Sequence, residues 1–195
     1  MADDTRTRVT HLLARLQDGD TVAVDELFAL LYGELRVIAH RQRRRWRGDD
    51  TLQTTALVHE AFLKLVDQER IAAESRVHFL AVAARAMRHI LCNYARDQRA
   101  QKRGGAIEHV AIDESKDNAA PSHGSSEAME VLVELDEQLR RLEQVDARQS
   151  KVVECRFFGG LTIEETAAAL GISPRTVKRD WAMAQAWLHR EMNTR

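Results

Sequence analysis

The chain has 195 residues, enough for one or two compact units, and its composition favours small helical domains. Apolar residues make up 44% and aromatic residues only 5%, a mixture that suits helices packed through Ala and Leu. Two prolines and nine glycines are too few for the turns of an all-β sandwich or barrel. The 29 basic and 30 acidic side chains nearly cancel, so any attraction to nucleic acid must come from a local cluster.

The sequence lacks the patterns of a secreted, membrane or metal-binding protein. The start, MADDTRTRVTHLL, has neither the basic residues nor the apolar core of a signal peptide, and no stretch reaches about 18 apolar residues. Cys92 and Cys155 are isolated, and we expect both to be buried apolar groups. His59 and Glu60 begin a pattern similar to the zinc-binding HExxH, but Leu63 occupies the position of the second histidine. We therefore expect a cytoplasmic protein that binds other molecules and has no cofactor, metal or catalytic group.

Residues 104–129 are predicted to form a flexible linker between two helical domains. The segment holds paired glycines, a proline, several serines and repeated acids, without a helical apolar period. It separates an N-terminal domain, residues 1–103, from a C-terminal domain, residues 130–195. The predicted fold class is all-α, with two small helical domains and a helix-turn-helix in the second.

Four helices are predicted in the N-terminal domain. The first covers about residues 8–17, and the second begins after an Asp20 cap and continues to about Ile38. The third covers about residues 51–67 and the fourth about residues 77–103. The third helix carries apolar residues at the spacing of a buried stripe, namely Val58, Ala61, Phe62 and Leu65.

The fourth helix gathers its arginines on one side. At about 100° per residue they fall within an arc of about 80°, beside the apolar stripe rather than opposite it. A solvated face usually mixes charges of both signs, whereas only Asp97 interrupts this one, so we favour a phosphate-binding face over a solvated one. The arginines in the arc are Arg85, Arg88, Arg96, Arg99 and Arg103.

Two successive helices near the C-terminus match a helix-turn-helix. Thr162 and Glu165 have the spacing of a capping box, and Gly171 supplies a tight break. Ser173 is the expected N-cap of the next helix and Pro174 its first residue. In a DNA-binding helix-turn-helix the start of the second helix enters the major groove, where polar and basic side chains bond phosphates and guanine edges. An ordinary helical hairpin is the alternative. The side chains at that position are Ser173, Arg175, Thr176, Lys178 and Arg179.

Three segments carry a resemblance to a known family. ALVHEAFLKL, residues 56–65, resembles a polymerase-clamp helix of the form DLVQETFLRL. FLAVAARAMRHILCNYARDQRAQKRGG, residues 79–105, is similar to a helix that binds the promoter −10 element, and residues 130–195 are similar to a −35-element domain. Together they resemble bacterial sigma-70-like transcription initiation factors of the extracytoplasmic-function (ECF) type.

The resemblance implies a sigma factor that binds RNA polymerase core and promoter DNA, and is not an enzyme. The alternatives are a helix-turn-helix regulator with a helical sensor domain and, more remotely, an enzyme with an unrecognised helical active site. Carried over by position, the clamp contact would be supported or made by Leu57, Glu60, Phe62 and Leu63. The −10 element would lie along Arg85, Arg88, Asn93, Arg96 and Arg99, and the −35 element would be read by Ser173, Arg175, Thr176, Lys178 and Arg179.

One departure from the family pattern concerns charge. Members usually carry acids just before the Leu of DLVQE, whereas residues 51–56 of this chain read TLQTTA. The sequence resembles in this respect the subgroup associated with Ser/Thr protein kinases, in which a phosphate is thought to replace the missing carboxylates. A phosphothreonine adds about −1.5 to −2 charges, which the start of a helix favours. The alternative is that these threonines only cap the helix.

Among the threonines we rank Thr51 first because it follows a run of arginines that could clamp a phosphate. Thr55 comes second, since it aligns closest to a family acid, and Thr54 third. A kinase is therefore an expected partner, while an anti-sigma protein is neither required nor forbidden by the sequence. The arginines expected to pair with the phosphate are Arg43, Arg44, Arg45 and Arg47.

Overall fold

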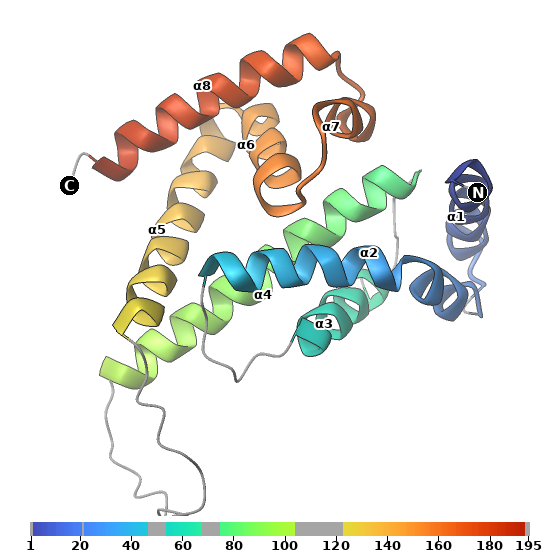
Figure 1. The fold of residues 1–195 in the computed structure, drawn as a ribbon, viewed down its shortest axis with the longest axis horizontal. Helices are drawn as coiled ribbons and strands as arrows, with labels where there is room; N and C mark the ends of the chain where they lie inside the picture. Colours follow the sequence, from blue (N-terminus) through green and yellow to red (C-terminus); the bar gives the residue numbers. More distant parts are fainter. Residues whose placement is uncertain (1, 21, 47–53, 68–74, 104–122, 194–195) are drawn as a thin grey trace, which may run out of the picture.

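The computed structural model describes residues 2–20, 22–46, 54–67, 75–103 and 123–193, and the regular structure in these ranges is helical throughout (Figure 1). The prediction of an all-α fold is confirmed. None of the helices in these ranges is both long and apolar enough to cross a membrane. The elements are α1 Ala2–Gln17, α2 Val22–Trp46, α3 Thr54–Asp67, α4 Arg76–Arg103, α5 His123–Val145, α6 Ala147–Val153, the π-helical turn η1 Glu154–Phe158, α7 Ile163–Leu170 and α8 Pro174–Asn193.

The first four helices form the N-terminal half, and their starts follow local signals. Asp20 caps α2 as predicted, because its Oδ1 accepts the Val22 N–H at 3.0 Å. The other carboxylate oxygen pairs with Arg15 at 2.7 Å, which ties the end of α1 to the start of α2. α1 begins at Ala2, earlier than the residue 8 that its apolar period indicated.

The predicted apolar stripe of α3 is confirmed. Its four members, residues 58, 61, 62 and 65, are buried against α2 and α4. Phe62 packs on Phe28 of α2 with a ring-centroid distance of 4.4 Å. Because the stripe is inside, the opposite side of α3 faces outward, where it exposes Glu60 and Leu63.

The C-terminal half consists of α5 to α8 and is organised by short-range caps. Asp146 caps α6 by accepting the N–H groups of the second and third residues beyond it. The predicted capping box of Thr162 and Glu165 is present at the start of α7. Gly171 ends α7 with φ 64°, a left-handed conformation that favours glycine. These caps fix the turn that leads into α8.

The two halves pack on each other through one contiguous set of buried apolar residues. α4 contacts α2 and α3 of the N-terminal half and also α5, η1 and α7 of the C-terminal half. Figure 1 shows α4 between these two groups of helices in the sequence order, with α5 and α7 near its opposite ends. α5 begins at His123, inside the segment predicted as linker, whereas residues 104–122 lie outside the described residues. The C-terminal members of the shared core include Leu132, Leu135, Leu139, Leu142, Phe158 and Leu161.

Candidate nucleic-acid interface

The start of α8 is a capped, exposed and basic tip. The Ser173 hydroxyl accepts the Thr176 N–H at 3.1 Å and lies 2.8 Å from the Thr176 hydroxyl. The Ser173 side chain, which the sequence assigned to DNA, therefore caps the helix, and the Thr176 hydroxyl, assigned to DNA as well, contacts it. The basic residues beside them are exposed to solvent, namely Arg175, Lys178 and Arg179.

A buried carboxylate anchors this tip to the rest of the C-terminal half. Asp180 is 1% exposed and accepts hydrogen bonds from Arg148 Nε at 2.5 Å and from Arg179 Nε at 3.2 Å. Burial alone would raise the pKa of Asp180, but the two arginines outweigh it and the pKa is lowered. Arg179 thus has a structural partner as well as an exposed guanidinium, and Arg148 of α6 holds α8 in place.

The basic arc of α4 has a different environment, because the C-terminal half covers its centre. Arg88 is only 1% exposed and contacts Asp136 of α5 at 3.3 Å and Glu154 of η1 at 2.8 Å. Its guanidinium also lies 5.7 Å from the ring centroid of Phe158. Arg88 is therefore not on the surface, although the sequence analysis placed it on a phosphate-binding face. Its assignment to DNA stays a prediction.

Asp136 forms ion pairs with arginines from both halves. It is fully buried, and its Oδ2 pairs with Arg96 of α4 and with Arg140 of α5, the latter at 3.2 Å. The contacts between Arg88 and the two acids are ion pairs outside hydrogen-bonding geometry, which leaves Arg88 Nε and Nη1 and Asp136 Oδ1 without a hydrogen bond. Arg88 is therefore held to the two acids by charge more than by directed hydrogen bonds.

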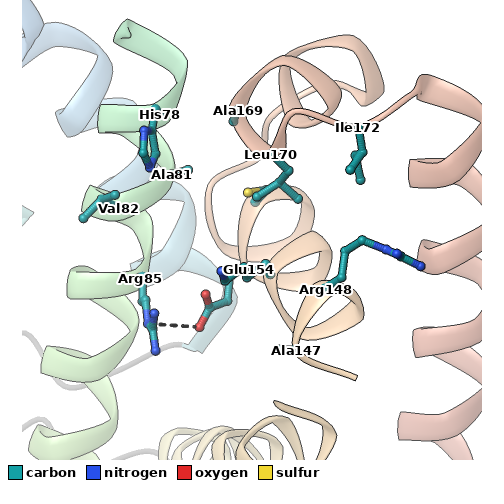
Figure 2. Close-up of a pocket in the computed structure, with 12 residues that line it drawn as sticks. His78, Ala81, Val82, Arg85, Ala147, Arg148, Glu154, Ala169, Leu170 and Ile172 are labelled. Atoms are coloured by element: carbon teal, nitrogen blue, oxygen red, sulfur yellow. Dashed lines mark ion pairs between the residues drawn. The ribbon is translucent and has the colours of Figure 1, made fainter. Parts of the chain in front are cut away.

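Arg85 lies at the edge of the same junction. It pairs with Glu143 of α5 at 3.2 Å and with Glu154 at 3.6 Å, and is itself half-exposed. Figure 2 shows Arg85 and Glu154 facing each other across a cleft of about 540 Å³ between α4 and the helices α6 and α7. Burial raises the pKa of Glu154, against the lowering effect of the positive charges of Arg88 and Arg85.

Other predicted −10 residues lie outside the covered zone. Arg99 is exposed on α4, while the side chain of Arg103, which belongs to the basic arc but not to the predicted −10 residues, is outside the described residues. Asn93 is also exposed, and its side-chain oxygen accepts a hydrogen bond from Arg96 at 3.1 Å. The arc is thus exposed toward the end of α4 and buried near its middle.

The predicted polymerase-binding residues divide between the two faces of α3. Leu57 and Phe62 are buried and can only support the helix. Leu63, by contrast, is 66% exposed, and Glu60 beside it is exposed and paired with Lys64 at 3.1 Å. Leu63 is one of several large apolar residues that are exposed in the described part of the chain.

The threonine cluster can be followed only in part. Thr51, Arg45 and Arg47 belong to the residues whose side chains the structure does not describe. Thr54 begins α3, and its hydroxyl accepts a hydrogen bond from Arg43 Nη1 at 3.2 Å. Thr55 and Arg44 are exposed. The first turn of α3 holds no acid, which agrees with the charge departure seen in the sequence.

These observations place an exposed, capped and basic helix start in the C-terminal half and an exposed leucine on α3 of the N-terminal half. Comparison with known proteins gives the family of the chain: residues 6–194 match the family model for ECF sigma factors, and the chain belongs to that family. It is 33% identical over 177 residues to "ECF RNA polymerase sigma factor SigF" of Caulobacter vibrioides (strain NA1000 / CB15N), covering 90% of this chain and 88% of the relative. Sigma factors bind RNA polymerase core and promoter DNA to start transcription and are not enzymes.

Sequence reasoning missed the acids that pair with the arginines of α4. Asp136 lies on the apolar face of α5 with Leu132, Leu135 and Leu139, and all four are buried. An acid within an apolar helical stripe is a readable signal, since buried carboxylates need a cationic partner. The identity of that partner could not be read, because Arg88 is distant in the sequence.

Proposed function

We propose that this sigma factor contacts the promoter −35 element with the start of α8 and the −10 element with α4, and binds polymerase through the outer face of α3. The observation that carries the proposal is the exposed basic tip of α8, which is capped by Ser173 and anchored by the hydrogen bonds of Asp180. Guanidinium groups at such a position can bond two guanine acceptors or adjacent phosphates.

The test of the assignment is run-off transcription by polymerase core supplied with the purified chain. We expect Arg175→Ala to reduce transcription from a promoter with its −35 element but not from one in which that element is scrambled. Arg190→Ala is a matched control, because Arg190 is an exposed arginine near the other end of α8. Equal loss with Arg175→Ala and Arg190→Ala would contradict the assignment of the tip.

For the polymerase contact we propose that Leu63 is the central apolar group. Leu63→Asp places a charge on an exposed position and should leave the fold intact while weakening core binding. Val131→Asp adds the same charge at another exposed apolar position, on α5, and is the control for a general effect of an added charge. A pull-down of core with equal yield for Leu63→Asp and the wild type would exclude this face.

The switch proposal is that phosphorylation in the threonine cluster supplies the negative charge that the start of α3 lacks. The sequence ranks Thr51, Thr55 and Thr54 in that order. The Arg43 contact adds support for Thr54, because a phosphate on that hydroxyl would meet a guanidinium already within hydrogen-bonding distance. A dianionic group at the start of a helix also gains from the helix dipole.

The experiment compares core binding before and after treatment with a Ser/Thr kinase. Phosphorylation should strengthen binding in the wild type, and the variant that changes Thr51, Thr54 and Thr55 to Ala should not respond. Arg43→Ala should abolish the response if phosphothreonine 54 is the active form, whereas Arg44→Ala serves as the exposed control. Unmodified and kinase-treated protein that bind core equally would contradict the switch and leave the rest of the proposal intact.

A further inference from the structure

The junction between the halves brings acids onto a face that the proposed function assigns to DNA. Arg88 and Arg96 of α4 meet Asp136, and Arg85 and Arg88 meet Glu154. Each of these carboxylates comes from the C-terminal half. A DNA phosphate would be expected to contact the same guanidinium groups, since phosphate and carboxylate both accept hydrogen bonds from arginine.

We propose that the C-terminal half masks the middle of the basic face of α4 in the free chain, with Asp136 and Glu154 standing where DNA phosphates would bind. The inference rests on the proposed role of α4 and extends it to regulation. DNA and the C-terminal half compete for Arg88, so the halves must separate before that part of α4 can reach the −10 element. The closed arrangement is therefore an inactive state of the sigma factor.

The chemistry of the junction suits an exchange of partners. A buried ion pair stabilises a contact only when its geometry is good enough to repay the loss of hydration. Here two nitrogen atoms of Arg88 and one oxygen of Asp136 have no hydrogen bond. Separation returns these groups to water and leaves the arginine ready for a phosphate. The buried apolar residues that the two halves share beside these ion pairs hold the closed arrangement without competing for phosphate.

Further contacts close the junction from the other side. Gln42 of α2 donates a hydrogen bond from Nε2 to the Phe158 carbonyl at 3.1 Å. Gly160 has φ 66°, and the Arg41 guanidinium lies so close that a Cβ at this glycine would overlap it. Two residues of α2 thus contact the end of η1 and the turn after it, and Arg88 of α4 lies over the ring of Phe158. The C-terminal half is therefore held by two helices of the N-terminal half, α2 and α4.

A native cysteine inside the junction can report whether the two halves separate. Cys92 of α4 is fully buried, and burial together with the neighbouring Asp136 carboxylate raises its pKa to about 12. A buried thiol with a raised pKa reacts slowly with maleimides, because the thiolate is the nucleophile. Separation of the halves should expose Cys92 and speed its alkylation. Peptide mass mapping distinguishes it from Cys155, so no cysteine has to be replaced.

The experiment changes the covering half and leaves α4 intact. Glu154→Lys sets a cation against Arg88 and Arg85 and should open the junction, while Asp136 beside the reporter is retained. Glu137→Lys is the matched control, because Glu137 is an exposed acid on α5 and the change in charge is the same. A second opening variant, Gln42→Ala with Glu154→Gln, adds no positive charge. Circular dichroism checks that each variant keeps its helical content.

We measure alkylation of Cys92 by N-ethylmaleimide and binding of a fluorescein-labelled random-sequence single-stranded DNA to the full chain. Loss of a buried charge partner should raise the alkylation rate on the order of tenfold, and DNA affinity should rise by a similar factor. Glu137→Lys should match the wild type in alkylation and gain little DNA affinity. The same pattern in the second variant, which gains no cationic side chain, would show that exposure, rather than an added cation, is the cause.

Three results would overturn the masking. Cys92 of the wild type could react as fast as in urea, both opening variants could leave it protected, or exposure of Cys92 could leave DNA affinity unchanged. A pull-down of polymerase core with the kinase-treated wild type separates this inference from the proposed function. If core is not bound while Cys92 and DNA affinity change as expected, the masking holds and the assignment of α3 fails.

Discussion

The start of α8 and the middle of α4 carry the same kind of sequence signal and meet opposite environments. Arg175 of α8 extends into solvent, whereas Arg88 of α4 is buried between two carboxylates. Clustered arginines on one side of a helix predict an anionic partner in both cases. The difference teaches that the anion can come from the same chain, so an arginine cluster does not by itself indicate an open nucleic-acid surface.

The strongest test of this contrast removes the buried acid. Asp136→Ala leaves Arg88 with one carboxylate in a buried site, and we expect it to lower the free energy of unfolding by about 3–5 kcal/mol. Replacing both partners, as Arg88→Met with Asp136→Leu, should lower it less, because no unpaired charge stays buried at that pair. Urea unfolding followed by circular dichroism measures both values. Equal losses in the single and double variants would mean that packing, not charge, holds the junction.

A second test compares the arginines within the exposed tip. Arg175→Ala should weaken −35-dependent binding by about 1–3 kcal/mol if the side chain makes a bidentate base contact. Arg179→Ala should weaken it similarly and also lower stability, because Asp180 loses one of its two arginine partners. Anisotropy of labelled promoter DNA and thermal unfolding separate the two effects. Unchanged DNA binding in both variants, with the fold intact, would place the −35 contact on another face.

A smaller effect concerns how firmly the tip is held. Thr162→Ala removes the hydroxyl that accepts the Glu165 N–H at 3.1 Å, and we expect a loss of about 0.5–2 kcal/mol in the free energy of unfolding. Cys92 should stay protected, because this cap is formed by neighbouring residues within the C-terminal half. Exposure of Cys92 in this variant would show that the junction depends on the turn before α7.

The smallest expected effect is the pH dependence of stability that arises from a histidine in the covered region of α4. Burial, with the adjacent positive charge of Arg88, lowers the pKa of His89 to about 4 from 6.5. As the pH is lowered, the unfolded chain binds a proton at His89 below about pH 6.5, whereas the folded chain binds it only near pH 4. The free energy of unfolding should therefore decrease as the pH is lowered from about 6.5 to about 4. The charged groups that face His89 are Arg85 and Arg88 from α4, and Asp136 and Arg140 from α5.

The raised pKa of Glu154 acts in the opposite direction, since the folded chain then binds a proton at Glu154 more readily than the unfolded chain. His89→Gln removes only the histidine contribution. Its unfolding free energy, measured by urea titration at pH 7 and at pH 5, should decline less than that of the wild type. A steeper decline in the variant would contradict this assignment.

Much of the local structure was readable before any fold was known. The apolar stripe of α3, the capping box before α7 and the glycine that ends it depend on residues within a few positions of one another. Such signals act through helix period and backbone hydrogen bonding, which the order of residues specifies directly. The start of α5 was misplaced because residues 123–129 have a polar composition typical of a linker, although they continue a helix that is fixed further along by its buried leucines.

The sequence by itself determined an all-helical chain with a capped basic helix near its C-terminus and the family to which it belongs, because these follow from local spacing and from similarity along the chain. Only the tertiary structure decided which arginines are open. Arg88 meets Asp136, Arg148 meets Asp180 and Gln42 meets Phe158 across long stretches of sequence. Burial and charge pairing depend on how helices pack, and packing joins residues that no helical period connects.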